Sequence, residues 1–370
     1  KTYFGAIPDV TIPLTPYREF DIEVRCNVGG AAVTVLAPDG SQLVPDAAGN
    51  YAGTYGTYTV KAGKVGYRHF ASTFTIGDSA SGLQIFDVSL TEAPAGAWDG
   101  VTLTEPRRSD TGVYEIGTGA ELAWYAAAAD RSPGAFLTAD IDLADYDWTP
   151  IGRSYAEPFA ATFTGGGHTV SGLCAVDADA DNVGLFGYAQ GTAETPAAIT
   201  GVTVAGRVSG NRSVAGLLGC AGRYVRVDTC ASYADVISRG KGAAGIVGFL
   251  SSGTSSVRRC YNAGSVTSAE AHAGIVGAIN AGCTAVSDVF SVGAVSPGPM
   301  ASACVGSQAD KTGITGAWAL EAGEVPDPSS IVAADVMASG EVAFRLGSPF
   351  GQLIGTDPHP RFGAPAVYYE

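Results

Sequence analysis

Three aspartates spaced two residues apart are the strongest candidate for chemistry in this sequence: Asp177, Asp179 and Asp181. Carboxylates with this spacing begin the calcium-binding loop of an EF-hand, which also needs glycine at its sixth position and glutamate at its twelfth. Those two positions hold Asn182 and Tyr188 here. The pattern is therefore open to two interpretations, a Ca²⁺ site or a solvated turn, and calcium-dependent melting would favour the first.

The familiar catalytic motifs do not occur in the 370 residues. The four histidines are scattered, and there is no HExxH zinc motif, no GxSxG nucleophile elbow and no GxxxxGK[ST] phosphate loop. His168 follows three glycines, and we interpret it as a structural residue that bonds a neighbouring loop or coil. Apart from Ca²⁺ at the three aspartates, the sequence predicts no cofactor.

A repeated apolar phrase dominates the middle of the chain and must position whatever site the protein has. The phrase reads GLFG at 184–187, GLLG at 216–219, AGIVG at 244–248 and 273–277, and ACVG at 303–306. Its closing glycines are 32, 29, 29 and 29 residues apart, and a fixed period of this size is typical of a solenoid. We attribute the glycines to corners where the backbone needs a positive φ.

Two further apolar positions recur in each period at spacings of 28 to 30 residues. The two sets are Val227, Val257, Val286 and Ile314, and Val208, Val236, Val266 and Val295. Three apolar anchors per period predict three short strands per coil, in four to five coils stacked about 4.8 Å apart. Because one coil cannot bury its apolar face alone, we expect the stability to come from stacking.

The same alignment places charged side chains of neighbouring coils next to one another. Asp228 falls beside Arg258, and Arg259 falls beside Asp288. Opposite charges on adjacent strands attract, so we predict two ion pairs between coils, each a modest contribution at the surface.

The solenoid is expected to occupy residues 96–326, beginning with a helix. Thr118 and Glu121 form a capping box, in which each side chain bonds the backbone of the other. A helix near 118–130 would then cover the open edge and exposed core of the first coil.

The segments on either side of the solenoid predict two further parts. Residues 1–95 show alternating apolar and polar side chains interrupted by turn residues, which indicates a small β-sandwich of about seven strands. Residues 327–370 are predicted to close the last coil, with a short helix that is capped by Ser339.

Several phrases of the solenoid resemble those of a known family. DIDL, WTPIG, GGGHTVSGL and GLFG follow one another in the order seen in GLUG-motif repeat proteins. That family includes bacterial cell-surface proteins and the region preceding the protease domain of IgA-cleaving metallopeptidases. The resemblance covers residues 98 to 325 and implies an all-β chain built on a right-handed parallel β-helix.

The first part of the chain has a resemblance of its own. The runs VTVLAPDGSQL and GNYAGTYGTYTVKAGKVGYRHF, within residues 28–90, resemble PEGA and carboxypeptidase-regulatory-like sandwich modules. Those families imply a spacer or binding module attached to a surface.

Composition and charge narrow the class of partner. The net charge is −15, which disfavours nucleic acid, although the repeats from 184 to 306 carry eight Arg or Lys against five Asp or Glu. No apolar run approaches the roughly 20 residues of a transmembrane helix, so no membrane insertion is expected. The first residue is Lys1, and we expect a processed protein or a part of a longer one.

The seven cysteines form no CxxC pair and predict neither a zinc site nor a disulfide scaffold. Cys230 and Cys260 fall at equivalent positions one coil apart. Small buried core residues are the first interpretation, and a disulfide between the two is the alternative.

Parallel β-helices also include polysaccharide-acting enzymes, so catalysis is the alternative that must be weighed. Hydrolysis of glycans needs two carboxylates about 5–9.5 Å apart. The repeats offer only five acidic residues: Glu194, Asp228, Asp235, Glu270 and Asp288. Two of these already have predicted arginine partners, so an enzyme is the least favoured function.

The sequence therefore predicts a non-enzymatic, monomeric protein that is secreted or attached to a cell surface. Its first function would be structural or adhesive, as a rigid column presented outside the cell. The alternative is a module that binds a carbohydrate or a host protein. An aromatic-lined groove with convergent polar groups would favour binding, and a featureless surface would favour a spacer.

Overall fold

The computed structural model describes residues 19–77, 80–280, 285–298, 300–306, 313–320 and 330–368. The chain divides into two compact units, with the boundary between Ala93 and Pro94. Both units consist mainly of β-strands, and each has its own hydrophobic core.

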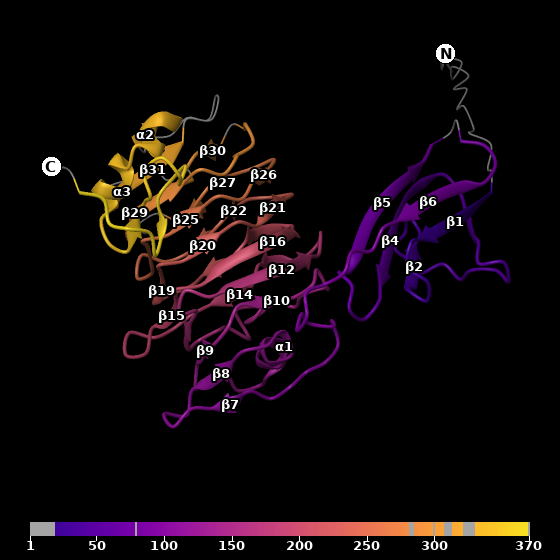
Figure 1. The fold of residues 1–370 in the computed structure, drawn as a ribbon, viewed down its shortest axis with the longest axis horizontal. Coiled ribbons are helices and arrows are strands. Elements are labelled where there is room, and N and C mark those ends of the chain that lie inside the picture. Colours follow the sequence, from indigo (N-terminus) through magenta and orange to yellow (C-terminus); the bar gives the residue numbers. More distant parts are fainter. Residues whose placement is uncertain are drawn as a thin grey trace, which may run out of the picture. The chain divides into compact units, whose positions relative to one another are not determined.

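The first unit is a sandwich of two three-stranded sheets (Figure 1). One sheet contains β1 (Phe20–Cys26), β3 (Tyr51–Gly53) and β6 (Gln84–Val88), and the other contains β2 (Ala32–Leu36), β4 (Gly56–Gly63) and β5 (Phe70–Ile76). Phe74 of β5 stacks on Phe86 of β6 with 4.9 Å between the ring centroids, which ties the sheets together. The described residues of this unit form six strands rather than the seven or so expected.

The second unit is a parallel β-helix, as predicted, with about six turns rather than the four to five expected, and its strands lie one above another in Figure 1. The largest of its three parallel sheets turns a corner within the coils and includes the strands β10 (Ile141–Asp142), β11 (Thr162–Thr164), β12 (Thr169–Val176), β15 (Ala197–Thr200), β16 (Thr203–Gly210), β19 (Val225–Asp228), β20 (Ala231–Ser232), β21 (Asp235–Ser238), β24 (Ser256–Arg258), β25 (Tyr261–Asn262), β26 (Val266–Ser268), β29 (Ala285–Ser291), β31 (Ile314–Leu320) and β32 (Ser330–Val332). Joined to its first coil are β7 (Arg107–Arg108), β8 (Tyr114–Ile116) and β9 (Ala135–Leu137).

Two narrower sheets close each coil. The five-stranded sheet contains β13 (Asp181–Val183), β17 (Arg212–Ala215), β22 (Ala243–Ala244), β27 (His272–Ala273) and β30 (Ala301–Ser302). The four-stranded sheet contains β14 (Phe186–Ala189), β18 (Leu218–Ala221), β23 (Val247–Leu250) and β28 (Val276–Ile279). The repeated apolar phrase thus spans the corner between these two sheets.

The register between coils is the one that the apolar anchors predict. Val227 pairs with Val257, and Val257 pairs with Val286 in the next coil. The second set of anchors aligns in the same way, from Val236 to Val266. These valines are buried, so the repeat places one apolar side chain above another along the whole core.

The closing glycines of the phrase serve a purpose different from the one predicted. None of Gly187, Gly219, Gly248, Gly277 and Gly306 has a positive φ. A Cβ on Gly248 would instead lie 2.7 Å from the carbonyl oxygen of Gly219 in the preceding coil. The glycines are there because neighbouring backbones pass too closely for any side chain.

The positive φ lies at another corner and is not confined to glycine. Thr229, Arg259 and Asp288 have φ values of 55°, 48° and 56°, and Gly201 and Gly316 occupy the corresponding places in the first and last of these coils. A non-glycine residue in this region costs on the order of 1–3 kcal/mol. Stacking of the coils must therefore hold these three residues in a strained conformation.

Exchanging Gly248 for alanine is expected to lower the free energy of unfolding by about 1–3 kcal/mol, since a methyl group would collide with backbone on two sides. Chemical denaturation followed by circular dichroism measures this. Gly29→Ala is the control, because a Cβ there meets nothing within 4 Å. Equal stability of G248A and the parent would contradict the close-contact explanation.

Thr229→Gly is expected to raise the free energy of unfolding by about 0.5–1 kcal/mol, because relief of the strained φ exceeds the entropy cost of glycine. Thr203→Gly, in the extended strand β16, should instead lower it by about 1 kcal/mol. The same denaturation measurement compares the two. A loss of stability in T229G as large as that in T203G would show that the corner is unstrained.

The predicted capping helix is present as α1 (Gly119–Ala127), which begins and ends within the expected range. The Thr118 hydroxyl accepts a hydrogen bond from the Glu121 amide, and the Glu121 carboxylate accepts one from the Thr118 amide. Leu122 and Tyr125 are fully buried and belong to the core of the β-helix. The helix therefore covers the first coil with its own apolar face.

The C-terminal segment packs against the column in a way that the sequence did not predict. It forms α2 (Ala334–Ala338), α3 (Glu341–Leu346) and a hairpin of β33 (Phe350–Gly351) with β34 (Arg361–Phe362). Its apolar residues join a separate cluster with Tyr261 and Phe290, which stack in successive coils. The segment covers the flank of several coils, and the N-cap of α3 is Gly340 rather than Ser339.

The structure leaves Cys230 and Cys260 as free, fully buried thiols. The Cys230 thiol donates to the carbonyl oxygen of Asp228 at 3.2 Å, and burial raises the pKa of Cys260. The interpretation as small core residues therefore describes both positions, and the alternative disulfide is not formed.

Arg259 forms its ion pair with Asp228, so neither predicted pairing, Asp228–Arg258 or Arg259–Asp288, occurs as an ion pair among the described residues. Asp228 and Arg258 do lie opposite each other in the two strands, but the carboxylate of Asp228 binds the guanidinium of Arg259. The hydrogen bond with Asp228 is the main cause that raises the pKa of Arg259, and Asp288 adds to it by its charge. Arg259 thus lies between the two acidic residues of its neighbouring coils.

Candidate binding groove

The three aspartates of the predicted calcium site bind different partners. Asp177 accepts a hydrogen bond from the amide of Asp179 at 3.1 Å, as in an Asx turn. The Asp179 carboxylate forms an ion pair with Arg239 at 3.1 Å, and Asp181 accepts a hydrogen bond from Asn211 at 2.9 Å. In the part of the chain that the structure describes, no three His, Cys, Asp or Glu side chains lie close enough to hold a metal ion.

Millimolar Ca²⁺ is accordingly expected to leave the melting temperature unchanged, because the three carboxylates do not point to one place. Differential scanning fluorimetry with Ca²⁺ and with EDTA tests this. A rise in melting temperature that Asp179→Asn abolishes would instead support the calcium interpretation.

His168 has the structural role predicted for it. Its Nδ1 lies 3.1 Å from the carboxylate of Asp140, one coil away, and the same carboxylate accepts a hydrogen bond from the amide of Thr169. These bonds lower the pKa of Asp140. The DIDL and GGGHT phrases are thus bound to each other across adjacent coils.

Two of the five acidic residues considered for a polysaccharide-cleaving site are bound to local side chains. Asp228 is paired with Arg259, and Asp235 accepts a hydrogen bond from the hydroxyl of Ser265 at 2.6 Å. Glu194 lies in the turn that the Thr192–Thr195 hydrogen bonds close.

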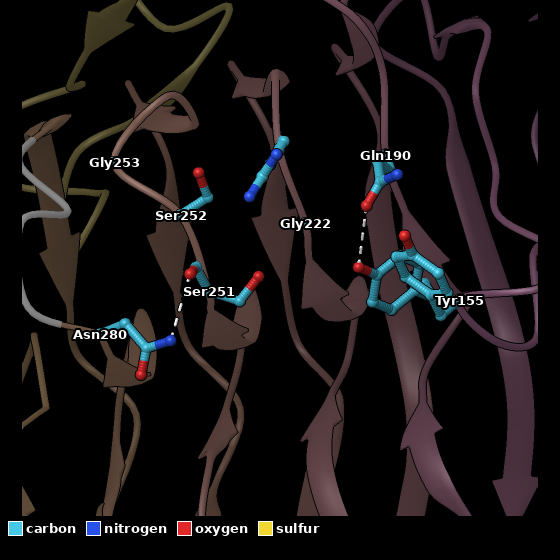
Figure 2. A pocket seen from close by; sticks show the side chains of 9 residues that line it. Tyr155, Gln190, Gly222, Ser251, Ser252, Gly253 and Asn280 are labelled. Carbon is cyan, nitrogen blue, oxygen red and sulfur yellow. Dashed lines mark hydrogen bonds between the residues drawn. The ribbon is translucent and has the colours of Figure 1, made fainter.

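A polar groove that the sequence did not reveal runs along the turns after the four-stranded sheet. The residues that directly follow β14, β18, β23 and β28 are aligned, one per coil, and comprise Gln190, Gly222, Ser251 and Asn280. Each donates its backbone amide to the preceding coil, for example Ser251 to Ala221 at 2.9 Å. Figure 2 shows these residues on successive strands, with Tyr155 beside Gln190 and Asn280 at the opposite end.

The groove exists because these turns differ in length. Three residues, 222–224, connect β18 to β19, whereas seven residues, 190–196, and five residues, 251–255, form the turns on either side. The short turn leaves space between its longer neighbours, and the resulting groove has a volume of about 710 Å³. That volume lies in the range of small-molecule sites.

Glycine keeps the floor of the groove open. A Cβ on Gly222 would lie 2.7 Å from the Tyr188 hydroxyl and 3.0 Å from the side-chain oxygen of Gln190. Those two groups are hydrogen-bonded to each other at 3.1 Å. A side chain at position 222 would therefore displace the Tyr188–Gln190 pair.

Two tyrosines form the aromatic end of the groove. The rings of Tyr155 and Tyr188 meet edge to face, with 6.0 Å between their centroids. Tyr155 is 73% exposed, so a flat apolar surface faces solvent there. Burial raises the pKa of Tyr188, while the positive charge of Arg223 acts in the opposite direction.

The remaining lining residues carry hydrogen-bonding groups. Asn280 donates its amide to the carbonyl oxygen of Ser251 at 3.1 Å, which fixes its orientation. The Gln190 side-chain nitrogen has no hydrogen-bond partner within the described segments. The groove thus combines an aromatic surface, amides, hydroxyls and one guanidinium, from Arg223.

The fold and groove define a parallel β-helix protein with an external polar groove. No family model matches the chain, and no curated protein matches it. Among solved structures, it is similar to one described as "a putative immunoglobulin A1 protease from Bacteroides ovatus", with a TM-score of 0.54 and 19% identity. The match covers 70% of this chain and 95% of that chain. At this identity the likeness concerns the fold.

Among the described residues no helix is both long and apolar enough to cross a bilayer.

Proposed function

We propose that this protein is a non-enzymatic binding protein of the cell exterior, in which a rigid β-helix presents a groove for a carbohydrate. The observation that carries the proposal is the lining of the groove, where an exposed tyrosine lies next to amide, hydroxyl and guanidinium groups. Saccharides present hydroxyls to such polar groups and apolar C–H faces to aromatic rings.

The chemistry of the lining favours binding over cleavage. Glycoside hydrolysis uses two carboxylates on either side of the scissile bond. The described lining of the groove contains tyrosine, glutamine, asparagine, serine, glycine and arginine, and these are groups that donate and accept hydrogen bonds. Among the functions predicted from sequence, a carbohydrate-binding module therefore has the most support.

The rigid-spacer function remains compatible with the same column. Successive coils are joined by parallel strands on three faces, and both the first coil and the flank of the last coils are covered. The two functions make opposite predictions for the groove, because a spacer needs no ligand.

The test is a glycan array of neutral and acidic oligosaccharides probed with the full chain, followed by titration calorimetry of each positive glycan. At least one glycan is expected to bind, and Tyr155→Ala should weaken it by about 5–10-fold, because the exposed ring supplies about 1 kcal/mol of contact. Tyr368→Ala is the control, since Tyr368 is 83% exposed and does not line the groove.

Equal affinity of Y155A and Y368A would place the binding site elsewhere. If the full chain binds no glycan on the array, the carbohydrate proposal is overturned and the rigid-spacer function is the one that remains.

A further inference from the structure

One cation lies in the groove without a balancing charge. Arg223 is the single charged side chain of its described lining, and its guanidinium has no ion-pair partner in the described ranges. The repeats from 184 to 306 carry eight Arg or Lys, and Arg223 is the one of these that lines the groove. The other groups around it, from Gln190 to Asn280, are uncharged.

Arg223 lies between the other lining residues of the groove. It belongs to the short turn 222–224 that forms the floor, next to Gly222. The Tyr188 phenol and the Gln190 amide lie on one side, and Ser251 and Asn280 lie on the other. A ligand that follows the groove therefore passes Arg223 in its middle, with uncharged groups at both ends.

We propose, building on the carbohydrate function above, that the groove selects an oligosaccharide with one carboxylated sugar, and that Arg223 binds this carboxylate. The guanidinium fork matches a carboxylate with two parallel hydrogen bonds. The neighbouring amides and hydroxyls bind the hydroxyls of flanking sugars, and Tyr155 packs against a ring. Uronic acids and sialic acids are two sources of the carboxylate.

The groove also explains why a single charge is expected. Two adjacent acidic sugars would bring a second carboxylate to Gln190 or to Ser251 and Asn280, where no cation balances it. An amide or hydroxyl pairs well with a neutral sugar hydroxyl. The specificity of Arg223 should therefore be for one acidic position, flanked by neutral contacts.

The experiment measures the affinity of the full chain by titration calorimetry for matched acidic and neutral ligands. The uronate arm compares a trisaccharide that has one uronic acid between two neutral sugars with the methyl ester of the same trisaccharide, which keeps the sugar rings and removes the charge. The sialate arm compares sialyllactose with its methyl ester. We expect at least one acid to bind about 10-fold more tightly than its neutral counterpart, and the arm that shows this identifies the source.

Arg223→Gln is expected to abolish the preference for the acid over its neutral counterpart, because glutamine keeps a hydrogen-bonding group but carries no charge. Because the Arg223 side chain is exposed, this substitution is not expected to change the stability of the fold. Arg258→Gln is the matched control, because Arg258 is an exposed arginine of the outer surface of β24 that does not line the groove. The control should retain the full preference.

The outcomes separate this inference from the function on which it rests. Binding of acidic and neutral ligands with equal affinity, or an acid preference that survives in R223Q, would overturn the role of Arg223 and leave carbohydrate binding intact. Failure of every glycan to bind would overturn both.

Discussion

The column depends on the close approach of backbones at the glycines that end each apolar phrase. Gly248 leaves no space for a Cβ, because the carbonyl oxygens of Gly219 and Gly242 are both 2.7 Å from its position. This contact fixes the distance between coils at a value that parallel hydrogen bonding can use on all three faces. The alignment of the core valines from coil to coil depends on that fixed distance.

A rigid stack also supports features that an isolated coil could not. Thr229, Arg259 and Asp288 occupy a left-handed conformation that neighbouring coils impose. Inside the same stack, Asn262 is buried yet satisfied, because its amide bonds the backbone of Gly264 in both directions. The strained backbone conformations and the buried polar side chain therefore occur at positions where the stacked coils supply contacts and hydrogen bonds.

The fold could be read from the sequence because its period is carried by apolar residues that must be buried, such as Val227, Val257 and Val286. The capping box of Thr118 and Glu121 could also be predicted, because its two residues are only three positions apart in the sequence. The ion-pair partners were harder to predict, because strand register does not determine where a long side chain reaches. Asp228 lies opposite Arg258 in the strands, but its carboxylate binds Arg259, the next residue. The groove was missed because it arises from unequal turn lengths rather than from a motif. The signal was nevertheless present, since Gly187 and Ile199 are 12 residues apart whereas Gly219 and Val227 are 8 apart.

The turns that border the groove lie outside the hydrogen-bonded strands, and this separates recognition from folding. A turn such as 190–196 can change length at a small cost, since doubling a loop costs about 0.6 kcal/mol, while the coils beneath it keep their register. Descendants of one such column could thus acquire different ligands by insertion or deletion at these few positions. The architecture would stay constant while its specificity diversified.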